Sequence, residues 1–384
     1  MENPKNDRRG FLGKLLIGGS SLVALPFLAN STKQSDKDNK EEEETMEHPV
    51  KEVRALGFQW ETRDPFLFCV HHEDKYPKGN EEMGPDPSYL QGRQMGQDFL
   101  LKDGFRMYHG QSVPGFPGHP HRGFETITVV REGMVDHADS TGAAGRYGNG
   151  DVQWMTAGRG VQHSEMFPLI ESEKENPMEL FQIWLNLPKR SKMVDPHFKM
   201  LWSESIPVIE EKEDDILQAT IEVLAGKLID KAAPVAPPNS WANPEENEVA
   251  IYNIKLEPNG TYELPAASQG VNRTLYYYEG NDLVINEQFI PNYHAAEVDE
   301  NQALTLQAGA DVSKILVLQG KPIGEPVVQH GPFVMNTREE IQQTFEDYHA
   351  TQFGGWPWSR YDQVHDREKG RFALHSDGTE EIKS

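Results

Sequence analysis

HPHRGFETITVVREG, residues 119–133, and GDVQWMTAGRGVQHSEM, residues 150–166, are the two stretches that decide the fold. Both combine β-branched and aromatic residues with glycines at short intervals. That composition is typical of short strands joined by tight turns, because glycine adopts the positive φ that such turns require. An all-β sandwich or barrel is therefore the predicted fold class.

The same two stretches each place a pair of possible metal ligands at positions i and i+2: His119 with His121, and His163 with Glu165. Alternate side chains of a β-strand point to the same face, so each pair shares a face. A single histidine on a strand is more often a core or surface residue, but two such pairs favour a metal. Three neutral imidazoles and one carboxylate suit a divalent transition ion, most naturally iron(II).

Four other histidines lie nearby in the sequence, but none has a second ligand at a same-face spacing. We expect these residues at the surface or behind the ligands, with His109 the first substitute if one of the four ligands fails. They are His71, His72, His109 and His137.

Further short strands are predicted on both sides of a charged stretch, SESIPVIEEKEDDI. FLFCVHHE and LFQIWLNL precede it, and TIEVLAGKLI and KILVLQG follow it, which indicates two β domains in tandem. A late helix, REEIQQTFEDYHA, is capped by Asn336 or Thr337. The predicted organisation is a signal segment (1–29), an acidic linker (30–50), an N-terminal metal-binding domain (51–205), a C-terminal domain (206–358) and a polar tail (359–384) that wraps the surface or is mobile.

Composition limits the classes of function. The chain has 384 residues and a formal net charge of −24, so nucleic acid is an unsuitable partner without a compensating basic patch. Part of this charge is local, since the run Glu41 to Glu44 lies in a segment with the composition of a disordered linker.

The N-terminus resembles a twin-arginine export signal. Arg8 and Arg9 precede Phe11 and Leu12, and a weakly apolar run follows from Leu15 to Ala29. The run is too short and too rich in glycine and serine for a membrane span. We therefore predict a periplasmic protein, anchored in the inner membrane only if the signal stays uncleaved.

The single cysteine, Cys69, is consistent with export by this route. One thiol forms no internal disulfide, so the fold depends on its own core and ion rather than on disulfide bonds. The twin-arginine route carries proteins that have already folded, often with the cofactor inserted.

The two opening stretches, together with DPFLFCVHHE upstream and GKPIGEPVVQHGPFVMNTREEIQQTFEDY downstream, resemble the pirin family, iron-binding members of the cupin superfamily. The resemblance covers about Phe58 to Trp358. It implies a bicupin, in which two jelly-roll-like β barrels pack together. It also implies that the family's metal ligands fall on His119, His121, His163 and Glu165.

Two departures from the general cupin pattern matter. Cupins usually take a glutamate ligand from the first motif, which would be Glu125 here. With Glu165 as the carboxylate ligand, we expect Glu125 to hydrogen-bond a ligand or Arg122. In the second barrel, Asn272 and Thr274 stand where a histidine pair would be expected, so we predict no metal there.

Some pirins are quercetin 2,3-dioxygenases, and the resemblance implies a small phenolic substrate of the flavonol type together with O2. Glu165, or a hydroxide on the metal, would take the proton of the substrate hydroxyl. The alternative is a non-enzymatic, redox-responsive protein acting through a protein partner. A monomer is the default expectation.

Overall fold

Strands dominate the computed structural model, which describes residues 48–383. The predicted export signal and most of the acidic linker lie outside the described residues, so both stay predictions. Between His48 and Lys383, no helix combines the length and apolarity that crossing a bilayer requires. The predicted all-β architecture with a short C-terminal helix is confirmed.

Two six-stranded sheets form the first barrel, with strand orders β11-β8-β5-β10-β3-β2 and β27-β26-β7-β6-β9-β4. Tyr76 and Leu180 from one sheet share a buried apolar cluster with Val135 and Tyr147 from the other. The first sheet comprises β2 (Gln59–Trp60), β3 (Phe66–Tyr76), β5 (Phe124–Glu132), β8 (Val152–Thr156), β10 (Asn176–Asn186) and β11 (His197–Leu201). The second comprises β4 (Gly115–His121), β6 (Met134–Asp139), β7 (Ala144–Gly148), β9 (Val161–Met166), β26 (Arg371–Leu374) and β27 (Glu380–Lys383).

A seven-stranded and a four-stranded sheet form the second barrel, in the orders β1-β21-β18-β23-β16-β13-β12 and β17-β22-β19-β20. Aliphatic side chains such as Ile254, Leu275 and Leu304 fill its interior. Its strands are β1 (Val50–Ala55), β12 (Val208–Glu213), β13 (Ile216–Ala225), β16 (Ala250–Leu256), β17 (Thr261–Leu264), β18 (Asn272–Glu279), β19 (Leu283–Ile285), β20 (Gln288–Ile290), β21 (His294–Val298), β22 (Leu304–Ala308) and β23 (Ser313–Gly320).

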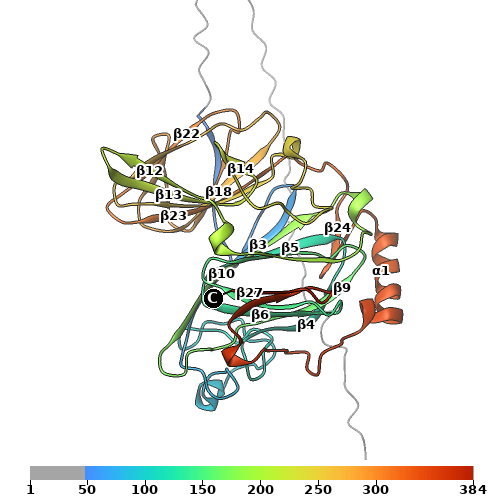
Figure 1. Cartoon of the computed structure of the whole chain (residues 1–384). Coiled ribbons are helices and arrows are strands. Elements are labelled where there is room, and N and C mark those ends of the chain that lie inside the picture. Colours follow the sequence, from blue (N-terminus) through green and yellow to red (C-terminus); the bar gives the residue numbers. More distant parts are fainter. Residues whose placement is uncertain (1–47, 384) are drawn as a thin grey trace, which may run out of the picture. The chain divides into compact units, whose positions relative to one another are not determined.

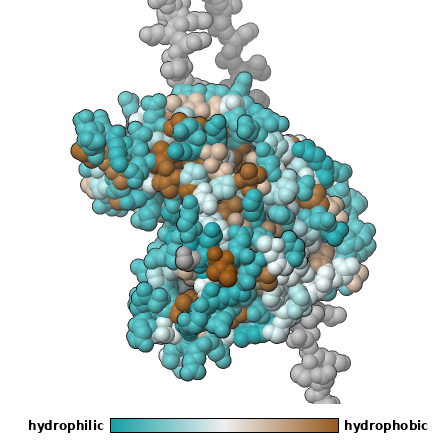
Figure 2. Space-filling model, in the orientation of Figure 1, coloured by the Kyte–Doolittle hydropathy of each residue, from teal (hydrophilic) through white to brown (hydrophobic). Residues whose placement is uncertain are grey.

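A third apolar cluster joins the six-stranded sheet of β5 to the seven-stranded sheet. Trp60 stacks on Tyr276 with ring centroids 5.1 Å apart, and Trp154 and Phe181 pack in the same cluster with Leu316. In Figure 1, β12, β13, β18 and β23 gather in one group and β3, β5, β10, β6 and β9 in another. The face drawn in Figure 2 is mainly hydrophilic with scattered apolar residues, as expected where the large apolar side chains are used in these cores.

At both ends of the described chain, a strand pairs with a strand of a different predicted domain. β1 pairs antiparallel with β21 of the second barrel, although Val50–Ala55 directly precedes the strands of the first. β26, within the segment predicted as a polar tail, pairs antiparallel with β7 of the first barrel. The predicted domain boundaries stay predictions, but strand pairing crosses them at both ends.

The predicted helix is α1 (Arg338–Thr351), and Thr337 rather than Asn336 caps it. Thr337 accepts a hydrogen bond from the Glu340 amide, and the Glu340 side chain returns to the Thr337 amide, which is a capping box. The remaining elements are short: β14 (Lys227–Leu228), β15 (Lys231–Ala232), β24 (Val328–His330), β25 (Phe333–Met335), and 3-10 turns at Pro87–Leu90, Lys189–Ser191, Ser203–Ser205, Glu245–Asn247, Gln352–Gly354 and Arg367–Lys369.

Candidate metal centre

Three histidines meet inside the first barrel because β4 and β9 are antiparallel neighbours. His119 is the cross-strand partner of His163, and His121 follows two residues later on the same face of β4. One nitrogen from each of the three rings lies within 4.8 Å of the others. Ring centroids are 4.5 Å apart for His119 and His163, and 4.9 Å apart for His121 and His163.

Burial keeps these three imidazoles neutral. His163 is fully buried and His121 nearly so, whereas His119 is only partly buried. Loss of solvation lowers the pKa of His119 to about 4, and it lowers the pKa values of His121 and His163 well below the ordinary value. Neutral imidazole is the form that binds a metal ion.

The hydrogen bonds of the triad fit a cation. His119 uses Nδ1 on the Pro117 carbonyl, 3.0 Å away, so its Nε2 keeps a lone pair for another partner. Neither ring nitrogen of His163 has a hydrogen-bond partner among the described residues. A buried polar group without a partner is costly, and a shared divalent ion would supply one. These residues therefore suit the transition metal that their chemistry predicts.

Glu165 lies beside the triad. Its Oε2 is 3.6 Å from His163 Nε2, but the cluster of mutually close ligand atoms contains only the three histidines. Thr128 Oγ1 lies 2.8 Å from Glu165 Oε1, and Gln182 Nε2 donates to Oε2 over 2.6 Å. Burial raises the pKa of the Glu165 carboxyl, and these two hydrogen bonds partly oppose the rise. Its role as the fourth ligand stays a prediction.

The other histidines lie either away from the triad or directly behind it. His109 is not part of the cluster and hydrogen-bonds the Gly96 carbonyl through Nδ1 over 2.6 Å. His72 and His137 are buried, so neither is a surface residue. The His137 ring lies 5.4 Å from that of His163, and its Nε2 lies 3.2 Å from Asp139 Oδ2. His137 thus stands directly behind the ligands.

The expectation for Glu125 was wrong. Its carboxylate accepts hydrogen bonds from Thr156 Oγ1 (2.6 Å) and Ser240 Oγ (2.5 Å), and Ser240 belongs to the connection between the two barrels. Arg122 instead pairs with Asp347 of α1, 2.7 Å away. Burial raises the pKa of the Glu125 carboxyl to about 7. Glu125 therefore links the barrel that holds the histidine triad to the connector and does not bond one of the three histidines.

Two residues that hold Glu165 were missed from the sequence. Thr128 lies on β5 and Gln182 on β10, in the sheet opposite β9, and Thr128 Oγ1 also lies 2.8 Å from the Gln182 amide oxygen. Both are polar residues among apolar neighbours on buried strands. That pattern was the available signal, because a buried polar side chain needs a polar partner.

The Pirin family model matches residues 81–185, and the model of the Pirin C-terminal cupin domain matches residues 251–354. The chain belongs to the pirin family. It is 38% identical over 268 residues to a candidate quercetin 2,3-dioxygenase of Pseudomonas aeruginosa, covering 69% of this chain and 87% of that one. Human pirin is 35% identical over 262 residues, covering 67% and 82%.

A solved structure agrees with this assignment. The crystal structure of a quercetin 2,3-dioxygenase from Acinetobacter baumannii is similar with a TM-score of 0.61 and 26% identity. The alignment covers 80% of this chain and 96% of that one. The predicted bicupin fold of this pirin is thereby confirmed.

Replacing Glu125 with glutamine should change how the stability of this pirin depends on pH. A carboxyl whose pKa is raised on folding contributes stability that is present below its unfolded pKa and lost as the pH rises through its folded pKa of about 7. Glutamine has nearly the same shape as glutamate but does not ionise. Urea titrations should show that the free energy of unfolding of the Glu125→Gln variant rises relative to that of the wild type between about pH 4.5 and pH 8. A stability difference that is the same at both pH values would contradict the assignment.

Replacing His163 with alanine should abolish most metal binding, because it removes the central partner of the other two histidines. We expect at least about 100-fold weaker binding, measured by chelator competition and elemental analysis. His294→Ala is the matched control, since His294 lies on β21 of the second barrel. Equal metal content in the His163→Ala and wild-type proteins would refute the site.

Proposed function

We propose that this pirin is a metal-dependent dioxygenase that opens the heterocycle of flavonol-like phenolic compounds. The observation that carries the proposal is the convergence of three neutral, largely buried histidines, of which one is partly exposed. A site of this kind offers a metal ion three ligands and leaves room for substrate, as catalytic metal sites do.

His119, His121 and His163 would hold the ion, with Glu165 as the fourth ligand. Iron(II) is the first choice for three imidazoles and a carboxylate, although other divalent transition metals suit the same donors. When bound, the metal would lower the pKa of the coordinated substrate hydroxyl and bring the electron-rich ring together with O2.

Glu165 is the group we assign to proton transfer. A flavonol must lose its 3-hydroxyl proton to become the anion that reacts with O2, and a carboxyl in a dry site is a suitable acceptor. Thr128 and Gln182 bond both carboxylate oxygens and so fix its orientation. Burial raises the pKa of Glu165, which makes it a stronger base than a solvated carboxylate.

Aromatic rings stand near the exposed side of the triad. The Phe116 ring lies 6.4 Å from that of His119. Phe99, which is 37% exposed, lies 5.0 Å from the His109 ring and 6.5 Å from the Phe116 ring. A flat phenolic ring approaching His119 would meet these side chains, and aromatic pairs in such geometry are favourable. The names of the similar proteins from Pseudomonas and Acinetobacter support the same substrate class.

Anaerobic mixing with quercetin should shift the flavonol absorption band of the metal-loaded protein. Admission of air should then release carbon monoxide and bleach the band, because ring opening expels one carbon. Glu165→Gln should retain part of the metal and slow turnover by about 100-fold or more, since it removes the proton acceptor. Glu263→Gln, at an exposed position of β17 in the second barrel, serves as a matched control. A fully loaded protein that neither shifts nor bleaches the band would refute the proposal.

A loaded protein without turnover would favour the alternative function, a redox-responsive protein acting through a partner. Its mark would be a change in proteolytic cleavage between the reduced and oxidised metal. No feature of the described residues favours this alternative over catalysis.

We further propose that the protein works in the periplasm. Replacing Arg8 and Arg9 with lysine should stop export, because twin-arginine transport depends on the paired arginines. Cell fractionation of the full chain, with a control substitution in the linker such as Glu43→Gln, would measure this. Equal periplasmic amounts of the Arg8→Lys/Arg9→Lys and wild-type proteins would contradict the predicted route.

A further inference from the structure

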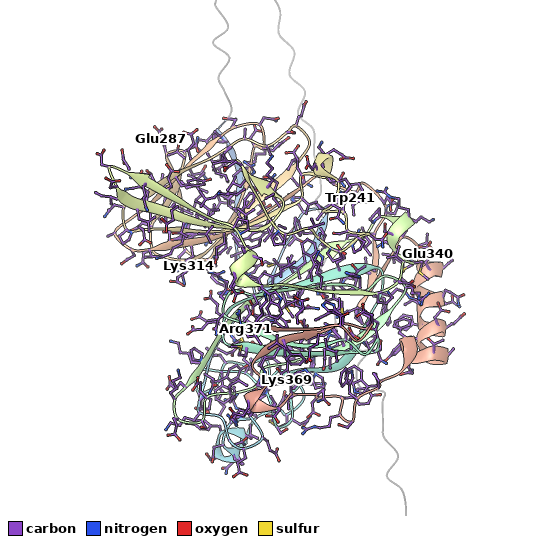
Figure 3. All side chains as sticks on the ribbon, in the orientation of Figure 1. Trp241, Glu287, Lys314, Glu340, Lys369 and Arg371 are labelled. Atoms are coloured by element: carbon purple, nitrogen blue, oxygen red, sulfur yellow. The ribbon has the colours of Figure 1, made fainter. Side chains whose placement is uncertain are left out.

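The C-terminal tail is built into the sheet that carries the histidines. Residues 355–383 continue beyond the match to the Pirin C-terminal cupin domain, which ends at residue 354. Within the tail, Phe372 of β26 pairs with Arg146 of β7, and β27 extends the sheet by one more strand. Figure 3 labels Lys369 and Arg371, which lie with this tail beside the strands of the first barrel.

A buried arginine fastens the tail. Arg146 forms two hydrogen bonds with Asp136, of 2.7 and 2.8 Å. Its remaining donors bond the carbonyls of His365 (2.9 Å) and Asp366 (2.7 Å) in the tail. A buried ion pair is stable only when all its donors are satisfied, and here tail carbonyls complete the set. The tail and the pair therefore depend on each other.

Two further contacts reach β6, the neighbour of β9. Trp358 Nε1 donates to the Asp139 carbonyl over 2.7 Å, and His365 Nε2 lies 2.9 Å from the His137 carbonyl. Asp139 is the cross-strand partner of His163. The tail thus lies along the strand that neighbours the ligand strand β9.

The most direct contact is with β4. The Gly118 amide, next to His119, donates to the Tyr361 carbonyl over 2.7 Å. A Cβ atom at Gly118 would lie 2.5 Å from Cδ1 of the Tyr361 ring, so glycine is needed for space. Trp356 stacks on the Tyr361 ring, with ring centroids 5.4 Å apart and an interplanar angle of 7°.

Strand β4 needs such support. It is the edge strand of its sheet, and its pairing with β9 is irregular between Phe116 and His119. Pro117 and Pro120 have no amide hydrogen, so β4 forms fewer ladder hydrogen bonds than an ordinary strand. An edge strand held loosely would let His119 and His121 move relative to His163.

We propose that the tail is a strap that positions the metal ligands, with Tyr361 and Gly118 as its contact to β4. The inference rests on the proposed metal site. Tyr361 contacts the β4 backbone at Gly118 and acts through it on the ligands, as a positioning residue. Its effect should appear as slower loss of the ion, because ligands held in place rebind before the ion escapes.

The test uses the full chain in four forms: wild type, Gly118→Ala, Tyr361→Ala and the double variant. Release of Co(II) to a chelator is followed by stopped flow. We expect each single variant to release the ion about tenfold faster, as for other groups that orient ligands. The double variant should be no faster than Tyr361→Ala alone, because the added methyl then has no ring to meet.

Two controls and a second readout keep the outcomes separate. Tyr361→Phe keeps the ring and the carbonyl and should release metal at the wild-type rate, as should Tyr293→Ala, an exposed tyrosine elsewhere. Amide hydrogen exchange of β4 in the metal-free proteins should be faster in Tyr361→Ala. Unchanged release and unchanged exchange in the variants would overturn the strap. A wild type that binds no metal would overturn the proposed function, and exchange would still decide the strap.

Discussion

The antiparallel pairing of β4 with β9 is the constraint on which the site depends. It places His119 directly across from His163, and the period of two residues brings His121 and Glu165 to the same interior. A slip of one residue would turn the ligands of one strand to the opposite face. The same pairing buries three imidazoles beside one another, which removes their charge. It therefore creates both the geometry and the unprotonated ring nitrogens that a metal ion would bind.

The site is shared by both sheets of the first barrel. β4 and β9 supply the three histidines and Glu165, while Thr128 and Gln182 of the opposite sheet hold the Glu165 carboxylate. A change in the spacing of the two sheets would separate Glu165 from Thr128 and Gln182. The apolar cluster between the sheets, which includes Tyr76 and Val135, fixes that spacing and so keeps the Glu165 carboxylate with its partners.

The sequence was sufficient to predict features that depend only on residues close together in the chain. The i, i+2 histidine pairs and the α1 cap follow from strand and helix geometry within a few residues, and Thr337 with Glu340 confirms the latter. It was insufficient where the partner is distant. Glu125 bonds Ser240, more than a hundred residues away, and the polar segment around Phe372 becomes a strand because β7 offers an unpaired edge. Such partners are set by tertiary packing, which no local pattern encodes.

Glu125 and Glu165 are both buried carboxylates, but they have different hydrogen-bond partners. In the general cupin pattern the position of Glu125 supplies a ligand, but here its carboxylate faces the connector, where Ser240 and Thr156 bind it. The predicted ligand role lies instead with Glu165 on β9, two residues after His163. The second barrel has an aliphatic interior and packs against the first through Trp60 and Tyr276. The apolar cluster between the barrels therefore packs against the sheet that carries Thr128 and Gln182.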